Sequence, residues 1–121
     1  MTRRAPSGQS AVQVTDDLIA EIVRRLLDAQ GGSKIVKIIL FGSAATGAMT
    51  RDSDIDLLVL ERSPGDARRE SVRLRAALRG MGFPFDVIVM DEAYFERTKR
   101  FVGGLAHPAN KYGRAVYAPG I

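Results

Sequence analysis

The stretch FGSAATGAMTRDSDIDLLVL, residues 41–60, decides much of the fold because it joins two apolar runs through a short polar loop. The first run is Ile35–Phe41, and the second is residues 55–60. Apolar runs of this length, rich in β-branched side chains, predict buried strands. Gly42 ends the first strand, and Gly47 marks a turn in the loop. Because so short a loop joins the two strands, we expect them to pair antiparallel.

Helical patterns lie on both sides of these strands. Thr15 is a suitable N-cap, and apolar residues recur after it at helical spacing as far as the glycines at 31 and 32. Asp66 can begin a second helix that runs to about Arg79. Asp91 can begin a last helix, in which Tyr94 and Phe95 are expected in the core.

Residues 85–90 form a third apolar run, which predicts a third strand, and residues 114–118 can add a short edge strand. The segment around Pro108 is expected to be irregular. The order of elements predicts an α/β (α+β) fold with a small mixed β-sheet packed against helices. We expect a flexible tail over residues 1–11 and a single domain over residues 12–121.

Composition narrows the possible functions. The chain has 121 residues and no cysteine, which excludes disulfide scaffolds, thiolate zinc sites and thiol nucleophiles. With 18 basic and 14 acidic residues the net charge is +4, which suits a polyanionic ligand such as a nucleotide. No apolar run reaches the roughly 18 residues of a membrane span, so we expect a cytoplasmic protein without a membrane partner.

Three aspartates begin the two middle strands. Asp54 and Asp56 are two residues apart, so their side chains point to the same face of the sheet. Asp86 begins the third strand in the same way. The intervening helix has the length of a crossover, and crossovers join parallel strands. We therefore expect the three carboxylates to meet at one end of the sheet, beside Gly42 and Ser43.

Such a group of carboxylates predicts a cation site, because the acids would otherwise repel one another. Oxygen ligands without His or Cys suit Mg²⁺ or Mn²⁺, and two such ions about 3.5–4 Å apart serve phosphoryl or nucleotidyl transfer. The alternative is that Asp54 is a turn residue, Asp56 a surface residue and Asp86 an edge charge. Acids are disfavoured in strands, yet both strands begin with them and are then apolar.

These residues resemble the nucleotidyltransferase superfamily typified by DNA polymerase β. That family has a Gly-Ser pair, ten further residues, an Asp-x-Asp pair and a third Asp on a later strand. Here the same order is Gly42-Ser43, residues 44–53, Asp54-Ile55-Asp56 and Asp86. The resemblance covers about residues 35–89, and the short chain is similar to the minimal nucleotidyltransferases. It implies a nucleotidyltransferase fold.

The resemblance also implies roles. Asp54 and Asp56 would bind two Mg²⁺ ions, and Asp86 would bind the catalytic ion and favour loss of the acceptor's proton. Nucleotide-binding residues would be Gly42 and Ser43, which hold the β- and γ-phosphates of ATP, with Arg51 and Ser53 from the same loop.

Minimal members of the family resemble the antitoxin of a two-gene toxin–antitoxin system. The implied partner is a HEPN-type toxin, and the implied reaction is transfer of AMP from ATP to a tyrosine hydroxyl of that toxin. One departure is that many relatives carry arginine just after Gly-Ser, where this chain has Ala44, Ala45 and Thr46. The alternative hypothesis is therefore a non-catalytic antitoxin that neutralises its toxin by contact.

A further alternative is binding of nucleic acid through the predicted helix after Asp66. This helix contains five arginines within twelve residues: Arg68, Arg69, Arg73, Arg75 and Arg79. Such a run is more often a solvated helix face, so nucleic acid is not the expected partner.

Overall fold

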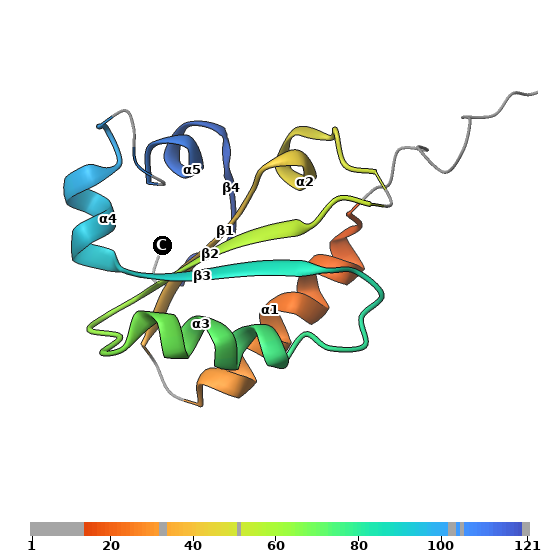
Figure 1. The fold of residues 1–121 in the computed structure, drawn as a ribbon, viewed down its shortest axis with the longest axis horizontal. Coiled ribbons are helices and arrows are strands. Elements are labelled where there is room, and N and C mark those ends of the chain that lie inside the picture. The colour runs from red at the N-terminus through yellow and green to blue at the C-terminus, as the bar shows by residue number, and fades with distance from the viewer. Residues whose placement is uncertain (1–13, 32–33, 51, 102–103, 105, 120–121) are drawn as a thin grey trace, which may run out of the picture.

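A sheet of four strands forms the centre of the computed structural model, which describes residues 14–31, 34–50, 52–101, 104 and 106–119 (Figure 1). The strands are β1 (Ile35–Phe41), β2 (Ile55–Glu61), β3 (Phe85–Asp91) and β4 (Arg114–Tyr117), in the order β3-β2-β1-β4. β1 pairs antiparallel with β2 and with β4, and β2 pairs parallel with β3. The predicted mixed sheet and its edge strand are confirmed, whereas the predicted tail lies outside the described residues.

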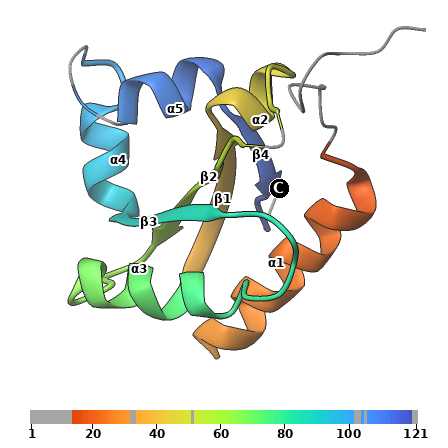
Figure 2. The ribbon, with the colours of Figure 1, turned by 45° about the vertical axis from the view of Figure 1, so that its right-hand side comes forward.

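The helices in the described part of the chain are α1 (Asp16–Gln30), α2 (Ser43–Thr46), α3 (Ala67–Ala76), α4 (Glu92–Thr98) and α5 (Ala106–Tyr112). α1 and α3 cover one face of the sheet, and α4 and α5 cover the other (Figure 2). The side chains of each strand alternate between these two faces, so each face has its own hydrophobic core. Within the described residues, no helix is both long enough and apolar enough to span a bilayer.

Side-chain caps begin the helices where the sequence predicted them. Thr15 Oγ1 accepts a hydrogen bond from the Leu18 amide at 3.1 Å, and Asp66 Oδ1 accepts one from the Arg69 amide at 3.1 Å. Asp91 Oδ1 accepts one from the Ala93 amide at 2.9 Å. Such caps satisfy amides that have no partner within the helix.

The second long helix, α3, ends earlier than predicted. It stops at Ala76, and the chain continues in tighter turns in which the amides of Leu78 and Arg79 donate to the carbonyls of Arg75 and Ala76. These bonds span three residues rather than four, which is typical of the end of a helix.

Two predictions about the C-terminal third are wrong. Residues around Pro108 form α5 rather than an irregular segment, because Pro108 lies in the first helical turn, where its missing N–H is not needed. Tyr94 is not a core residue, since 49% of it is exposed, whereas the prediction for its neighbour Phe95 is confirmed. α4 has only seven residues, and only one side of it reaches the sheet.

In the outer strand β3, one backbone amide donates a hydrogen bond to a side chain of α3. Ser71 Oγ of α3 accepts a hydrogen bond from the Val89 amide at 2.9 Å and donates to the Ala67 carbonyl at 2.8 Å. The hydroxyl thereby joins the crossover helix to the middle of the strand.

Candidate active site

Gly42 places the backbone directly against a carboxylate at the end of β1. Its φ of 71° and ψ of −153° belong to a region that only glycine occupies readily. A Cβ atom at this position would lie 2.2 Å from Asp56 Oδ2. The glycine therefore serves both the turn and the close approach of the chain to Asp56.

The register of the sheet brings the acidic residues together. Asp56 pairs with Phe41 across β1 and with Asp86 across the parallel strand β3. Register partners share a face, and this face is the one that α4 and α5 cover farther along the strands. Asp54 lies one residue before β2, and it is exposed, as is Asp86, whereas Asp56 is half-buried. The predicted juxtaposition of Asp56 with Asp86 is thus present.

The charges of Asp86 and Asp54 affect the ionisation of Asp56. Burial is the main influence that raises the pKa of Asp56, and the neighbouring charges of Asp86 and then Asp54 raise it further. Loss of solvation and repulsion between like charges both disfavour an ionised carboxylate. A bound cation would oppose both effects, so the donor set suits a hard divalent ion such as Mg²⁺.

The carboxylates do not form a ready-made metal cage. Among the described residues, no three His, Cys, Asp or Glu side chains are arranged to hold a metal ion. Binding would therefore require Asp54, Asp56 and Asp86 to draw closer together, which exposed Asp54 and Asp86 are free to do by changing rotamer.

The remaining predicted nucleotide-binding residues lie in the loop between β1 and β2. Ser43 begins α2 directly after Gly42, which places its amide at the turn. Ser53 closes a turn, because its Oγ accepts from the Thr50 amide at 3.0 Å and its own amide donates to the Thr50 carbonyl at 3.1 Å. Arg51 lies outside the described residues. The structure therefore gives Ser53 a role in positioning the chain just before Asp54.

Sequence reasoning missed the residue that anchors this loop. Met49 is 1% exposed and belongs to the core beneath α1 and α3. It is the one large apolar side chain among small and polar residues at 43–53, and that contrast was a usable signal. Its burial holds the loop against the sheet on the approach to the acids.

Comparison with solved structures shows the same fold in other proteins. The MntA-HpeT toxin–antitoxin pair, in a mutant form, has a chain with a TM-score of 0.59 and 19% identity, over 83% of this chain and 73% of that one. A Sulfolobus solfataricus protein assigned as a nucleotidyltransferase has a TM-score of 0.58 and 23% identity, over 86% of this chain and 80% of that one. A chain in the complex of tri-AMPylated Shewanella oneidensis HEPN toxin with MNT antitoxin has a TM-score of 0.52 and 18% identity, over 86% of this chain and 73% of that one.

Comparison by sequence gives a family assignment. None of the curated proteins compared matches the chain. The model of the nucleotidyltransferase domain matches residues 18–104, a span that runs from α1 to beyond α4. This span contains the Gly42-Ser43 turn and all three acids. By this match the chain belongs to the nucleotidyltransferase domain family.

Proposed function

We propose that the chain is a Mg²⁺-dependent enzyme that transfers AMP from ATP to a tyrosine hydroxyl of a HEPN-type toxin, and that it acts as the antitoxin. The observation that carries the proposal is the register that sets Asp86 beside Asp56, with Gly42 against the same carboxylate. Family membership supports nucleotidyl transfer. The likeness in fold to an MNT antitoxin in complex with a tri-AMPylated HEPN toxin supports the choice of AMP and of the partner.

Each part of the site has a chemical task in this proposal. Asp54, Asp56 and Asp86 would hold Mg²⁺, which supplies positive charge to the phosphates when bound. The amides at Gly42 and Ser43 would bind the β- and γ-phosphates. The acceptor oxygen forms a bond to the α-phosphorus, the bond to the β-phosphate oxygen breaks, and pyrophosphate leaves. Asp86 is exposed at the outer strand, where an approaching hydroxyl can reach it and lose its proton.

The test is transfer of label from α-labelled ATP to the HEPN-type toxin encoded beside this chain's gene. We expect labelled toxin with the wild-type chain and Mg²⁺, and none with the double variant Asp54→Asn, Asp56→Asn. Label that persists in the double variant would show that these acids do not carry the reaction. Absence of label with the wild-type chain, despite a stable complex, would reject the enzymatic proposal.

A second candidate is an antitoxin that acts by contact alone. Two observations favour it: no ready metal cage exists within the described residues, and Ala44, Ala45 and Thr46 replace the arginine found after Gly-Ser in many relatives. This candidate predicts that a folded Asp54→Ala, Asp56→Ala variant still protects cells from the toxin in full. Loss of protection in that variant would favour the enzyme.

A further inference from the structure

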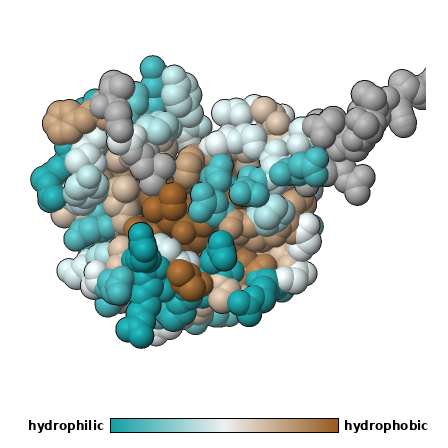
Figure 3. Space-filling model, in the orientation of Figure 1, coloured by the Kyte–Doolittle hydropathy of each residue, from teal (hydrophilic) through white to brown (hydrophobic). Residues whose placement is uncertain are grey.

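The helix α3 carries a stripe of exposed residues that the proposed reaction does not use. The stripe consists of Arg68, Val72, Arg75 and Arg79, spaced four, three and four residues apart. This spacing places Arg68, Val72 and Arg75 along one line of the helix, and Arg79 follows in the turn beyond it, beside the same cavity as Val72 and Arg75. Val72, which lies between the arginines, is 64% exposed. Figure 3 shows strongly hydrophilic surface over α3, interrupted by a hydrophobic spot.

A cavity of about 310 Å³ opens beside this stripe. Its apolar wall includes Val72, Leu78, Phe83 and Phe85, and its polar rim is made by Arg75 and Arg79. No carboxylate lines it. A volume of this size falls at the lower end of the range for ligand pockets, about 300–1,000 Å³, and suits one bulky side chain better than a cofactor.

The positive charges of the stripe have no counter-charge among the described residues. Arg73 on the same helix is paired, since its guanidinium bonds both carboxylate oxygens of Glu70. In the part of the chain that the structure describes, Arg68, Arg75 and Arg79 form no ion pair through their side chains. Like charges at these spacings repel and weaken a helix, so an acidic partner would stabilise this surface.

The cavity and the candidate active site lie near the same end of β3 but on opposite faces of the sheet, because consecutive residues of a strand point to opposite faces. The cavity wall includes Phe85, the first residue of β3, and Asp86 is the next residue. β3 is an outer strand, so no further strand separates the cavity from the side on which Asp86 is exposed. A protein that binds at the cavity and extends around this outer strand would therefore come close to the carboxylates.

We propose that the stripe and cavity dock an acidic amphipathic helix of the acceptor protein, which inserts an aromatic or aliphatic side chain between Arg75 and Arg79. This inference rests on the proposed function, since it names how that acceptor is held. An apolar cavity favours protein over nucleic acid. The aromatic rings in its wall are not free to stack on bases either, because Phe85 is buried and Phe83 is half-buried.

The first experiment measures binding of the HEPN-type toxin to the full chain. We expect the double variant Arg75→Glu, Arg79→Glu, and separately Val72→Asp, to weaken binding at least about 10-fold. The matched control for the double variant is Arg62→Glu, Arg69→Glu, which makes the same charge change on two exposed residues off the stripe and should stay within about 3-fold. Circular dichroism and urea unfolding confirm that each variant is folded. Unchanged binding and label transfer in the folded stripe variants would overturn the docking surface and leave the proposed function intact.

The second experiment does not depend on the toxin. Backbone amide shifts are recorded while the chain is titrated with a short acidic amphipathic peptide, with a scrambled peptide of the same composition, and with poly(U) RNA. Shifts confined to α3 and residues 78–86, stronger with the amphipathic peptide than with the scrambled one, support the surface even if no toxin becomes labelled. Equal response to both peptides, tighter binding of RNA at the same ionic strength, or no binding of any probe would overturn it.

Discussion

Gly42 brings the backbone closer to a carboxylate than any other residue would allow, so its replacement should affect the site and the fold together. Gly42→Ala would place Cβ 2.2 Å from Asp56 Oδ2 at a φ of 71°. We expect it to lower the free energy of unfolding by about 2–4 kcal/mol. Urea denaturation measures the loss, and label transfer to the toxin should disappear.

The matched control is Gly47→Ala. Gly47 has a similar φ of 81°, but a Cβ there would meet no atom within 4 Å. Only the conformational penalty remains, so we expect a loss of about 1 kcal/mol. Equal losses for the two variants would contradict a role for the contact with Asp56.

The ionised side chain of Asp56 lowers the stability of the metal-free protein, and a bound cation would remove this effect. Burial raises the pKa of this carboxyl, and the charges of Asp86 and Asp54 raise it further, so the ionised form destabilises the metal-free protein at neutral pH. We expect Asp56→Asn to raise the metal-free Tm by a few degrees. Mg²⁺ should raise the wild-type Tm but not that of the variant. Scanning calorimetry with and without Mg²⁺ makes the comparison, and an equal response in both proteins would count against Asp56 as a ligand.

Glu61 is a buried acid at the far end of β2 from Asp56. Its side chain is fully buried, and among the described residues neither carboxylate oxygen has a hydrogen-bond partner. Burial, and then the neighbouring Glu70, raise the pKa of Glu61 to about 7. A protonated Glu61 can donate a hydrogen bond to Glu70, so the folded protein favours the neutral form.

Stability should therefore fall with rising pH. Between about pH 4.5 and 7 the folded chain keeps a proton on Glu61 that the unfolded chain has lost, so the free energy of unfolding decreases through this window and is lowest above it. Glu61→Gln should remove this slope and stabilise the protein at pH 8 by about 1–2 kcal/mol, less than the full shift because of solvent screening. Unfolding curves from pH 5 to 8 test it, with exposed Glu96→Gln as a control that should leave the slope unchanged.

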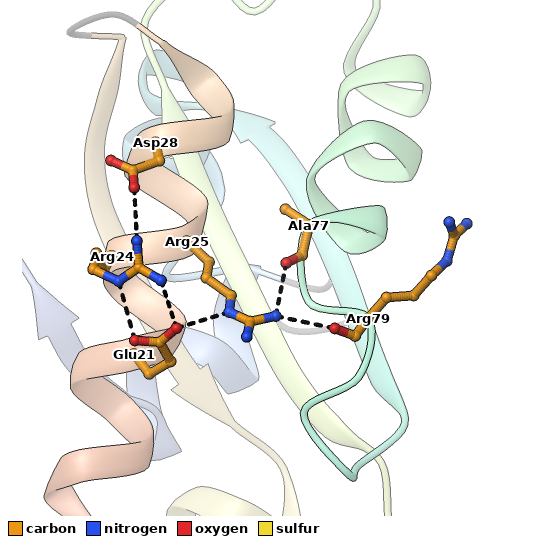
Figure 4. A network of polar contacts seen from close by, with 6 residues as sticks. All are labelled: Glu21, Arg24, Arg25, Asp28, Ala77 and Arg79. Carbon is orange, nitrogen blue, oxygen red and sulfur yellow. Dashed lines mark hydrogen bonds and ion pairs between the residues drawn. The ribbon is translucent and has the colours of Figure 1, made fainter.

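At the scale of elements, α1 and α3 cap each other's C-terminal ends. Arg25 of α1 donates to the carbonyls of Arg79 at 3.0 Å and Ala77 at 3.4 Å, just beyond α3 (Figure 4). Arg73 of α3 donates to the Ala29 carbonyl near the end of α1. The last turn of α1 has no basic residue of its own, so the neighbouring helix supplies the charge that favours its C-terminus.

This exchange predicts different effects for two adjacent arginines. Arg25→Met should lower the free energy of unfolding by about 1 kcal/mol, because carbonyls at the end of α3 lose a charged donor. Among the described residues, Arg24 bonds only to Glu21 and Asp28 of its own helix, and it is exposed, so Arg24→Met should cause no measurable change. Thermal unfolding of the two variants at low and high salt makes the comparison. A larger loss for Arg24→Met would contradict the cross-helix role of Arg25.

Sequence reasoning succeeded where the information is local. Caps such as Thr15 and strands such as Ile35–Phe41 depend on neighbouring residues, and the meeting of Asp56 with Asp86 follows from alternation and from the length of the crossover. It failed where distant packing decides, as in the exposure of Tyr94. The bonds from Arg25 to the end of α3 join residues more than fifty positions apart, so no local pattern could predict them.

At the scale of the whole molecule, the hydrophobic cores on the two faces of the sheet differ in size. Among the described residues, the core beneath α1 and α3 contains 14 buried residues, and the core beneath α4 and α5 contains six. Because buried apolar area governs local stability, we expect the amides of α4 and α5 to exchange with solvent through openings of lower free energy than those of α1 and β2. Native-state hydrogen exchange measures this difference. Uniform protection across the helices would show instead that the molecule opens as one unit.

The hydrogen bond from the Val89 amide to Ser71 Oγ also bears on self-association of the protein at high concentration. An uncovered outer strand is a template on which identical chains can add and grow into fibrils. Occupying one donor in the middle of β3 interrupts that template. We therefore expect Ser71→Ala to leave the fold nearly intact and to make the chain more prone to aggregate, as light scattering of concentrated solutions would measure.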